Sequence, residues 1–413
     1  MSLVKKNIFI LFIIQGTNYI FPLLTIPYLS RIFGPTGIGA LALAQATILY
    51  LTLVVDFGFN LTVTRKISIA YDKKDYLKIN HLYTQTLVIK FLIFLIVSLI
   101  VLLVCEFIPQ INSIKNLIYI GFISLLGAVI NPIWLFQGLQ RMSMLLIPTT
   151  LSKLISLLLI FVFVKESTDI NLAMLFTSLG VFLSGIVSLY YVKKLNLAAF
   201  CKININEAFK LVGESAYIFL SYIGSSVYTT MNTFIMSFFV GFRDIGIYSS
   251  ADKVVMTSQS LMSPIHQAIF PNLSSFSNKN DYLKKFKKYG ILLSSIASVI
   301  SLLLFFLSKN IVSILFGSKF YYAYKILEIL SPLPLIISLG VIFGQWGLIV
   351  IGESKVLGKI YLIAGLLHLS YIFIMLNYFG IYGAAVSIVL TESLVSVFLL
   401  VIFLRKIKNW DKN

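Results

Sequence analysis

Apolar runs recur along this chain from one end to the other, and they restrict its fold more than any other feature of the sequence. Each is about 20 residues long, the length that a helix needs to cross the hydrocarbon core of a bilayer. Hydrophobic residues make up 59% of the 413 positions and charged residues only 12%, whereas soluble domains carry roughly 25% charged residues. The sequence therefore predicts an all-α, polytopic integral membrane protein.

Twelve candidate spans follow from the apolar runs and their charged or turn-rich borders. They cover residues 7–29, 38–60, 83–105, 115–137, 144–164, 170–192, 211–240, 245–271, 289–308, 325–351, 358–378 and 382–404. The first resembles a signal peptide, because Lys5 and Lys6 precede it. It continues to Leu29, however, and Ser30-Arg31 follow instead of a cleavage site, so we interpret it as an uncleaved span.

The basic residues segregate to one side of this topology. Of the 33 lysines and arginines, 23 fall in the loops of one side, 7 on the other side and 3 inside spans. Cytoplasmic loops carry such an excess, so both termini are predicted to be cytoplasmic. The net charge of +18 is accounted for in this way and does not indicate a nucleic-acid partner. Cys105 and Cys201 fall on opposite sides, which excludes an intrachain disulfide.

Two similar segments lie half a chain apart and suggest an internal repeat. Lys73–Lys78 and Lys279–Lys284 share the order Asp-Tyr-Leu-Lys, at an offset of 206 residues. Such a repeat relates six spans to six spans in the same orientation, as in parallel transporter repeats. We therefore expect two six-helix bundles, residues 1–200 and 201–413, around a central cavity.

Charged side chains inside or beside the spans are the candidate functional residues, because a charge at the bilayer centre costs about 3 kcal/mol. Asp56 shares a helical face with Gln45 and Thr52, and Glu214 shares one with Asn232. These carboxylates, together with Asp252, are candidates for coupling transport to an ion gradient. Hydrogen bonds between helices are the other explanation for such polar faces.

Five basic residues are candidates for binding an anionic substrate: Lys253, Lys153, Lys90, Arg31 and Arg65. Lys253 can either bind substrate or neutralise Asp252 beside it. Lys90 and Lys153 can instead extend toward the cytoplasmic surface, and the two arginines lie at span ends, where interfacial anchoring is the alternative. His266 and His368 are expected to find partners within the bundle.

Sequence motifs for energy-coupled or chemical catalysis are missing from the chain. It has no Gly-x-x-x-x-Gly-Lys-Ser/Thr loop for nucleotides, no Ser-His-Asp order and no metal-ligand cluster compatible with the topology. We therefore expect no cofactor, no metal and no enzymatic activity, and a transport step driven by an ion gradient or by the gradient of the substrate.

Several segments resemble Wzx-type O-antigen flippases of the multidrug/oligosaccharidyl-lipid/polysaccharide exporter superfamily. The most specific of them, Gln15–Tyr19 and Pro22–Leu29, lie in the first span. Further matches are Arg31–Pro35, Asp56–Thr62, Asn131–Gly138 and Ile329–Pro334. The resemblance implies two six-helix bundles around a V-shaped cavity. It also implies the substrate, an undecaprenyl-pyrophosphate-linked O-antigen repeat unit moved from the cytoplasmic to the periplasmic leaflet of a bacterial inner membrane.

The candidate residues suit the charge and the sugars of this substrate. Lysine or arginine side chains can pair with its pyrophosphate, and Tyr19, Tyr28, Trp134 and Gln137 are candidates for contact with its sugars. Ordinary helix packing or an interfacial aromatic belt is the other explanation for the aromatic residues. The O-antigen polymerase and the chain-length regulator are the protein partners that the resemblance implies.

Three alternatives remain open at this stage. A drug or cation antiporter of the same superfamily would present mainly acidic or aromatic cavity groups, whereas lysines are present here as well. A lipid II flippase is closer, but the match in the first span favours the O-antigen branch. A membrane glycosyltransferase or polymerase would need a large loop outside the membrane, which the short loops between the spans do not provide.

Overall fold

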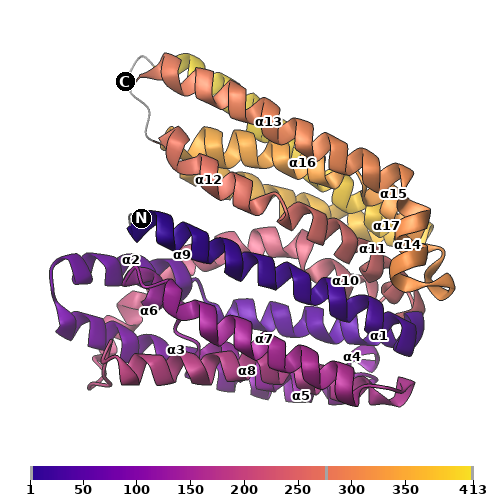
Figure 1. Cartoon of the computed structure of the whole chain (residues 1–413), viewed down its shortest axis with the longest axis horizontal. Coiled ribbons are helices and arrows are strands. Elements are labelled where there is room, and N and C mark those ends of the chain that lie inside the picture. The colour runs from indigo at the N-terminus through magenta and orange to yellow at the C-terminus, as the bar shows by residue number, and fades with distance from the viewer. Residues whose placement is uncertain (1–2, 275–277, 411–413) are drawn as a thin grey trace. The chain divides into compact units, whose positions relative to one another are not determined.

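The computed structural model describes residues 3–274 and 278–410. Side chains are described from Phe21 onward, apart from those of residues 221, 225, 267, 268, 271, 272 and 409. Every regular element in these ranges is a helix (Figure 1). The prediction of an all-α fold is therefore confirmed.

The chain divides into two compact units, and a short segment from the first half of the sequence belongs to the second unit. The first unit combines Met1–Thr25 with Ala40–Ile223, and the second combines Ile26–Gly39 with Gly224–Asn413. The units are defined by which residues contact one another, so a unit need not be continuous in sequence. The boundary at residue 200, which was expected from the repeat, stays a prediction.

Helices of the first unit are mostly long and joined by short turns. They are α1 (Leu3–Asp56, with Ile26–Gly39 in the second unit), α2 (Phe59–Asp72), α3 (Tyr76–Phe107), α4 (Pro109–Asn112), α5 (Lys115–Ile130), α6 (Ile133–Gly138), α7 (Ser143–Phe163), η1 (Ser167–Asp169), α8 (Ile170–Lys194) and α9 (Ile205–Thr229), of which the last continues into the second unit.

Small residues let α8 pack closely against its neighbours in the first unit. In Figure 1, α8 lies alongside α5 and α7. A methyl group added at Gly127 of α5 would lie 2.7 Å from the backbone of Phe182 in α8, and one at Gly185 would lie 2.8 Å from the Gly127 carbonyl oxygen. Close approach at small residues is how helices associate in lipid, where no hydrophobic force drives them together.

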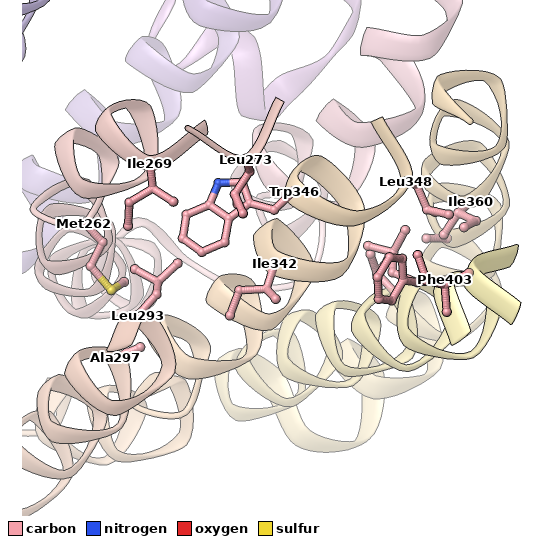
Figure 2. Close-up of a cluster of buried hydrophobic side chains, with 14 of the residues drawn as sticks. Met262, Ile269, Leu273, Leu293, Ala297, Ile342, Trp346, Leu348, Ile360 and Phe403 are labelled. Carbon is pink, nitrogen blue, oxygen red and sulfur yellow. The ribbon is translucent and has the colours of Figure 1, made fainter. Parts of the chain in front are cut away.

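The second unit has shorter helices and more breaks. Its further elements are α10 (Met231–Met236), α11 (Phe242–Ser260), α12 (Ser263–Ser274), α13 (Lys279–Phe306), α14 (Ser308–Phe316), η2 (Ser318–Phe320), α15 (Ala323–Leu330), α16 (Leu333–Gly340), the π-helix η3 (Val341–Ile349) and α17 (Ser354–Asn409). Figure 2 shows the core of this unit, in which the Trp346 indole is surrounded by Ile269, Leu273 and Ile342.

Eight helical stretches among the described residues are long and apolar enough to cross a membrane. Two of them, Phe21–Asp72 with 52 residues and Ser354–Lys408 with 55, far exceed one crossing, which takes about 20 residues. Gly34 (φ 64°) interrupts the first and Gly380 (φ 54°) the second. The count of twelve spans is not confirmed and stays a prediction.

The second of these stretches folds back on itself at Gly380. His368 Nδ1 and Thr391 Oγ1, which precede and follow the glycine, lie 2.7 Å apart, although 23 residues of straight helix would separate them by about 34 Å. A residue with positive φ reverses the chain at little cost only when it lacks a Cβ atom, as glycine does. The helix α17 is therefore a hairpin of two antiparallel arms.

Proline positions account for several of the other breaks. The helix α5 ends at Ile130, just before Asn131-Pro132, and α15 ends at Leu330, just before Ser331-Pro332. Pro264 lies in the first turn of α12, where the missing amide hydrogen has no intrahelical partner to lose. Pro22 and Pro27 behave differently, since both continue the helix α1.

Candidate functional site

The candidate site of the first unit is organised by a helix break at the end of α1. Phe57 (φ 43°) and Gly58 (φ 75°) both take left-handed conformations between α1 and α2. A methyl group on Gly58 would lie 2.8 Å from the Ser215 carbonyl oxygen, and the Phe57 ring stacks on Phe219 at 4.4 Å. The break is therefore packed directly against α9, and it places Asp56 at the C-terminal end of α1.

Asp56 and Lys90 form an ion pair at this break, in which the lysine side chain is buried and the aspartate is half-buried. Lys90 Nζ lies 2.7 Å from Asp56 Oδ1, and the Lys90 side chain is only 1% exposed. The other carboxylate oxygen accepts a hydrogen bond of 3.1 Å from Asn60. A membrane-embedded lysine costs about 3 kcal/mol, and the opposite charge of Asp56 offsets part of that cost.

The same ammonium group has a second role at the end of α5. Lys90 Nζ donates a 2.7 Å hydrogen bond to the carbonyl oxygen of Ala128. In a continuing helix this carbonyl would accept from the amide of residue 132, which is a proline without an amide hydrogen. Lys90 therefore donates to a carbonyl that the Asn131-Pro132 sequence leaves without a partner. Its positive charge is also stabilising at the C-terminal end of α5, where the helix dipole is negative.

Glu214 is also paired, at a neighbouring position on α9. Lys66 Nζ of α2 lies 2.6 Å from Glu214 Oε2, with both side chains partly exposed. Two turns earlier on α9, Glu207 accepts a 3.2 Å hydrogen bond from Gln85 of α3. Two acids of α9 thus connect this helix to α2 and α3.

The other charged candidates lie on different helices. Arg65 is exposed on α2, Lys153 is half-buried on α7, and Lys253 is exposed on α11 beside the half-buried Asp252. Arg31 donates a 3.0 Å hydrogen bond to the carbonyl oxygen of Ile314, in the last turn of α14. Since these last carbonyls lack intrahelical partners, the arginine acts there as a C-terminal cap.

The candidates for sugar contact are differently placed. Trp134 is fully buried in the core of the first unit, so its ring can meet a sugar only if the helices around it separate. Gln137 accepts a 3.4 Å hydrogen bond from Thr64, and Tyr28 is half-buried on α1. The side chain of Tyr19 lies outside the described residues. All four roles stay predictions.

Two further ionisable residues, Lys66 and Glu392, lie within the helices and are not among the candidates from the sequence. Lys66 was overlooked because it lies just beyond a predicted span, although it pairs with Glu214. Glu392 lies half-buried in the C-terminal arm of α17, close enough to interact electrostatically with Tyr228 and Tyr361. An acid within the apolar run 382–404 was the signal that could have revealed it.

Both histidines predicted to have partners have them, and the potential metal ligands that the structure describes lie apart. His266 Nδ1 accepts a 2.7 Å hydrogen bond from the Trp346 indole, and His368 contacts Thr391, so both have partners in the second unit, as expected. Within the described ranges, no three His, Cys, Asp or Glu side chains gather so that they could hold a metal ion.

Comparisons with known proteins agree on the class of molecule. The sequence profile of a family described as "Polysaccharide biosynthesis protein" matches residues 4–277. A candidate O-antigen transporter of Shigella dysenteriae is 35% identical over 399 residues, which cover 96% of this chain and 99% of the relative.

Two solved structures show the same fold. An inward-facing multidrug resistance MATE family transporter of the MOP superfamily has a TM-score of 0.75 at 13% identity, covering 95% of this chain and 96% of that one. The lipid II flippase MurJ, in an inward closed conformation, has a TM-score of 0.72 at 15% identity, covering 96% of this chain and 90% of that one.

Proposed function

The chain belongs to the family of polysaccharide biosynthesis proteins, and we propose that it is a flippase for lipid-linked polysaccharide repeat units. The observation that carries the proposal is the 35% identity with a candidate O-antigen transporter, because the match includes 96% of this chain and 99% of the relative. The multi-pass helical fold supports it, since a lipid-linked substrate must pass its polar head group through the membrane.

In finer terms, the proposed substrate is an undecaprenyl-pyrophosphate-linked O-antigen unit, carried from the cytoplasmic to the periplasmic leaflet of a bacterial inner membrane by alternating access. Its pyrophosphate needs cationic partners in a site that excludes most water, where charge-assisted hydrogen bonds are strong. Lys253 and Lys153 are the lysines that we propose for this role, because Lys90 already neutralises Asp56 and satisfies the Ala128 carbonyl.

Ion coupling is the second part of the proposal. Asp56 and Glu214 are paired with lysines in this conformation. Within the described residues, Asp252 lies in no ion pair of comparable distance, although Lys253 is its neighbour in sequence. We therefore propose Asp252 as the carboxylate that exchanges the coupling ion, with Asp56 and Glu214 taking part only in conformations in which their ion pairs are broken.

Complementation tests this function. The chain is expressed in a bacterium that lacks its own flippase but makes the matching repeat unit, and surface O-antigen is measured against accumulated lipid-linked unit. We expect wild type to restore surface O-antigen and Lys253→Ala or Lys153→Ala to reduce it at least about tenfold, which corresponds to about 1.4 kcal/mol of lost interaction. Lys284→Ala, which removes an exposed lysine at the start of α13, is the matched control.

Failure of well-expressed wild type on its cognate repeat unit would contradict the flippase proposal and favour the drug or cation antiporter. Rescue of a cell depleted of its lipid II flippase, without any effect on O-antigen, would favour lipid II instead. These alternatives must be separated by experiment, since both solved structures share the fold at no more than 15% identity.

A further inference from the structure

A charged pocket of about 490 Å³ lies in the first unit between α2, α3 and α9. Its polar lining comes from Lys66 of α2, from Asp75 at the start of α3, from Lys78, His81 and Gln85 of α3, and from Glu207, Lys210 and Glu214 of α9. Lys66, Lys78 and His81 lie within the predicted loop 61–82 and Lys210 within 193–210, and Gln85 and Glu214 lie within four residues of these loops. The distribution of basic residues assigns both loops to the cytoplasmic side.

The pocket is lined by three lysines and three acids, and each acid already has a hydrogen-bond or ion-pair partner. Asp75 accepts the backbone amide of Lys78 at 3.0 Å and so caps the N-terminus of α3. Glu207 accepts from Gln85 at 3.2 Å, and Glu214 pairs with Lys66 at 2.6 Å.

Two lysines of the pocket remain without a counter-ion. Within the described part of the chain, Lys78 and Lys210 form no ion pair, and both are exposed. They enter the pocket from different helices, α3 and α9. Two ammonium groups with free donors on either side of one cavity are suited to an anion with several oxygen acceptors, such as a phosphate or a pyrophosphate.

Apolar side chains around the pocket indicate that it lies at membrane depth. Leu77 is 75% exposed, Phe209 is 73% exposed, and Ile205 is 66% exposed. Each is within three residues of a charged residue that lines the pocket. Large apolar side chains beside lysines at the end of a span are typical of the interface, where the rings and chains enter the lipid and the charges face the head groups.

From this arrangement we propose that the pocket binds the phosphate of a membrane lipid in the cytoplasmic leaflet, with Lys78 and Lys210 as its ligands. Basic pockets at this depth take lipid head groups by the same chemistry. The phosphate has two possible sources. One is the pyrophosphate of the lipid-linked substrate, which rests on the proposed function, and the other is an ordinary anionic phospholipid, which does not.

Binding of defined lipids to the purified full chain tests the proposal. The probes are undecaprenyl pyrophosphate without sugars, phosphatidylglycerol and inorganic pyrophosphate, each titrated against detergent-solubilised protein by native mass spectrometry. The variant Lys78→Ala/Lys210→Ala removes both proposed ligands. The matched control, Lys73→Ala/Lys202→Ala, removes two exposed lysines from the same two loops that do not line the pocket.

We expect the pocket variant to weaken binding of undecaprenyl pyrophosphate at least about tenfold and the control variant to change it less than about twofold. An equal loss for phosphatidylglycerol assigns the site to lipid phosphate in general, and a loss confined to undecaprenyl pyrophosphate assigns it to the substrate. Both results support a lipid-phosphate site.

Three results would overturn it: unchanged lipid binding by the pocket variant, an equal loss in the control, or inorganic pyrophosphate binding as tightly as the lipids. Thermal unfolding of both variants shows whether they are folded, and neither substitution removes an ion pair or a buried group. Because binding is measured without transport, a failed complementation assay with intact lipid binding would contradict the proposed function alone.

Discussion

A lysine ammonium that is almost wholly removed from solvent needs a permanent counter-charge, and Lys90 obtains it from Asp56 at 2.7 Å. The Ala128 carbonyl provides a second acceptor. One amino group thus connects the end of α1, the middle of α3 and the end of α5. At the scale of single residues, this is the clearest case in which a candidate for substrate binding has a structural task.

Removal of one partner should cost more than removal of both. Lys90→Met leaves Asp56 without its counter-charge and the Ala128 carbonyl without a donor, so we expect the free energy of unfolding to fall by about 3 kcal/mol. The double variant Lys90→Met/Asp56→Asn should recover part of this loss, because no charge is left unpaired. Denaturant titration in detergent micelles, followed by tryptophan fluorescence, measures both effects.

Lys253→Met, which replaces an exposed lysine of α11, serves as the control and should change stability by less than about 0.5 kcal/mol. If Lys90→Met were as stable as wild type, the ion pair would have no structural role, and Lys90 would return as a substrate ligand.

The sequence identified Asp56 and Lys90 separately, as an acid and a lysine within apolar spans, but not as partners. Periodicity places each residue on a face of its own helix, whereas pairing depends on how far each helix is rotated and shifted against the next. The Asn131-Pro132 break, which leaves the Ala128 carbonyl available, was visible in the sequence, but its consequence for Lys90 depends on packing.

At the scale of helices, the closest approach is a crossing of two glycines in the second unit. A methyl group on Gly39 would lie 1.7 Å from the Phe242 carbonyl oxygen, and one on Gly246 would lie 1.9 Å from the Pro35 carbonyl oxygen. The contact is reciprocal, and its four residues belong to the segments Gly34–Ile38 and Gly241–Ile247 and their neighbours. Gly34 and Gly241 lie 207 residues apart and Ile38 and Ile247 lie 209 apart, close to the 206-residue offset of the internal repeat.

Alanine at either glycine should force the two helices apart. We expect Gly39→Ala and Gly246→Ala each to lower stability by about 1–3 kcal/mol, the usual cost of overpacking. Gly213→Ala on α9 is the control, since nothing lies within 4 Å of its added methyl group, and alanine is the better helix former there. Thermal unfolding in detergent compares the three, and equal midpoints would show that the crossing is easily separated.

Helix type was well predicted along the chain, and helix boundaries were not. The apolar runs are helical, as expected, but the run 211–240 breaks at Thr230 and the run 245–271 breaks near Leu261, without a proline at the first. A break of this kind depends on what packs against the helix. Conversely, Pro22 and Pro27 lie within α1 and do not end it.

At the scale of the whole molecule, the distribution of basic residues makes a prediction about orientation. Cys201 lies in a loop assigned to the cytoplasm and is partly exposed, whereas Cys105 is buried. A membrane-impermeant maleimide should therefore label the folded protein in inside-out vesicles and not in intact spheroplasts. A Cys201→Ser variant, which retains only Cys105, should stay unlabelled until the protein is denatured. Labelling of wild type in spheroplasts would show that the loop containing Cys201 faces the periplasm, opposite to the predicted orientation.

The family resemblance is the part of the whole-molecule reading that the comparisons confirm. It was accessible from the sequence because motifs such as Asp56–Thr62 and Asn131–Gly138 are local. The structure gives these motifs a physical reason, since the first forms the left-handed break at Phe57-Gly58 and the second the proline break beside Lys90. The binding roles of individual lysines were not accessible, because they depend on which lysines already have partners.

The hairpin of α17 has a consequence for how the chain enters the membrane during synthesis. Its turn, Asn377–Tyr382, contains no charged residue, and Tyr378 is 79% exposed, as expected for a ring at the lipid surface. The arms are joined by hydrogen bonds of the Thr391 hydroxyl with His368 and Tyr371. Both arms can therefore leave the translocon as one preassembled pair, with only an uncharged turn to be carried across the bilayer.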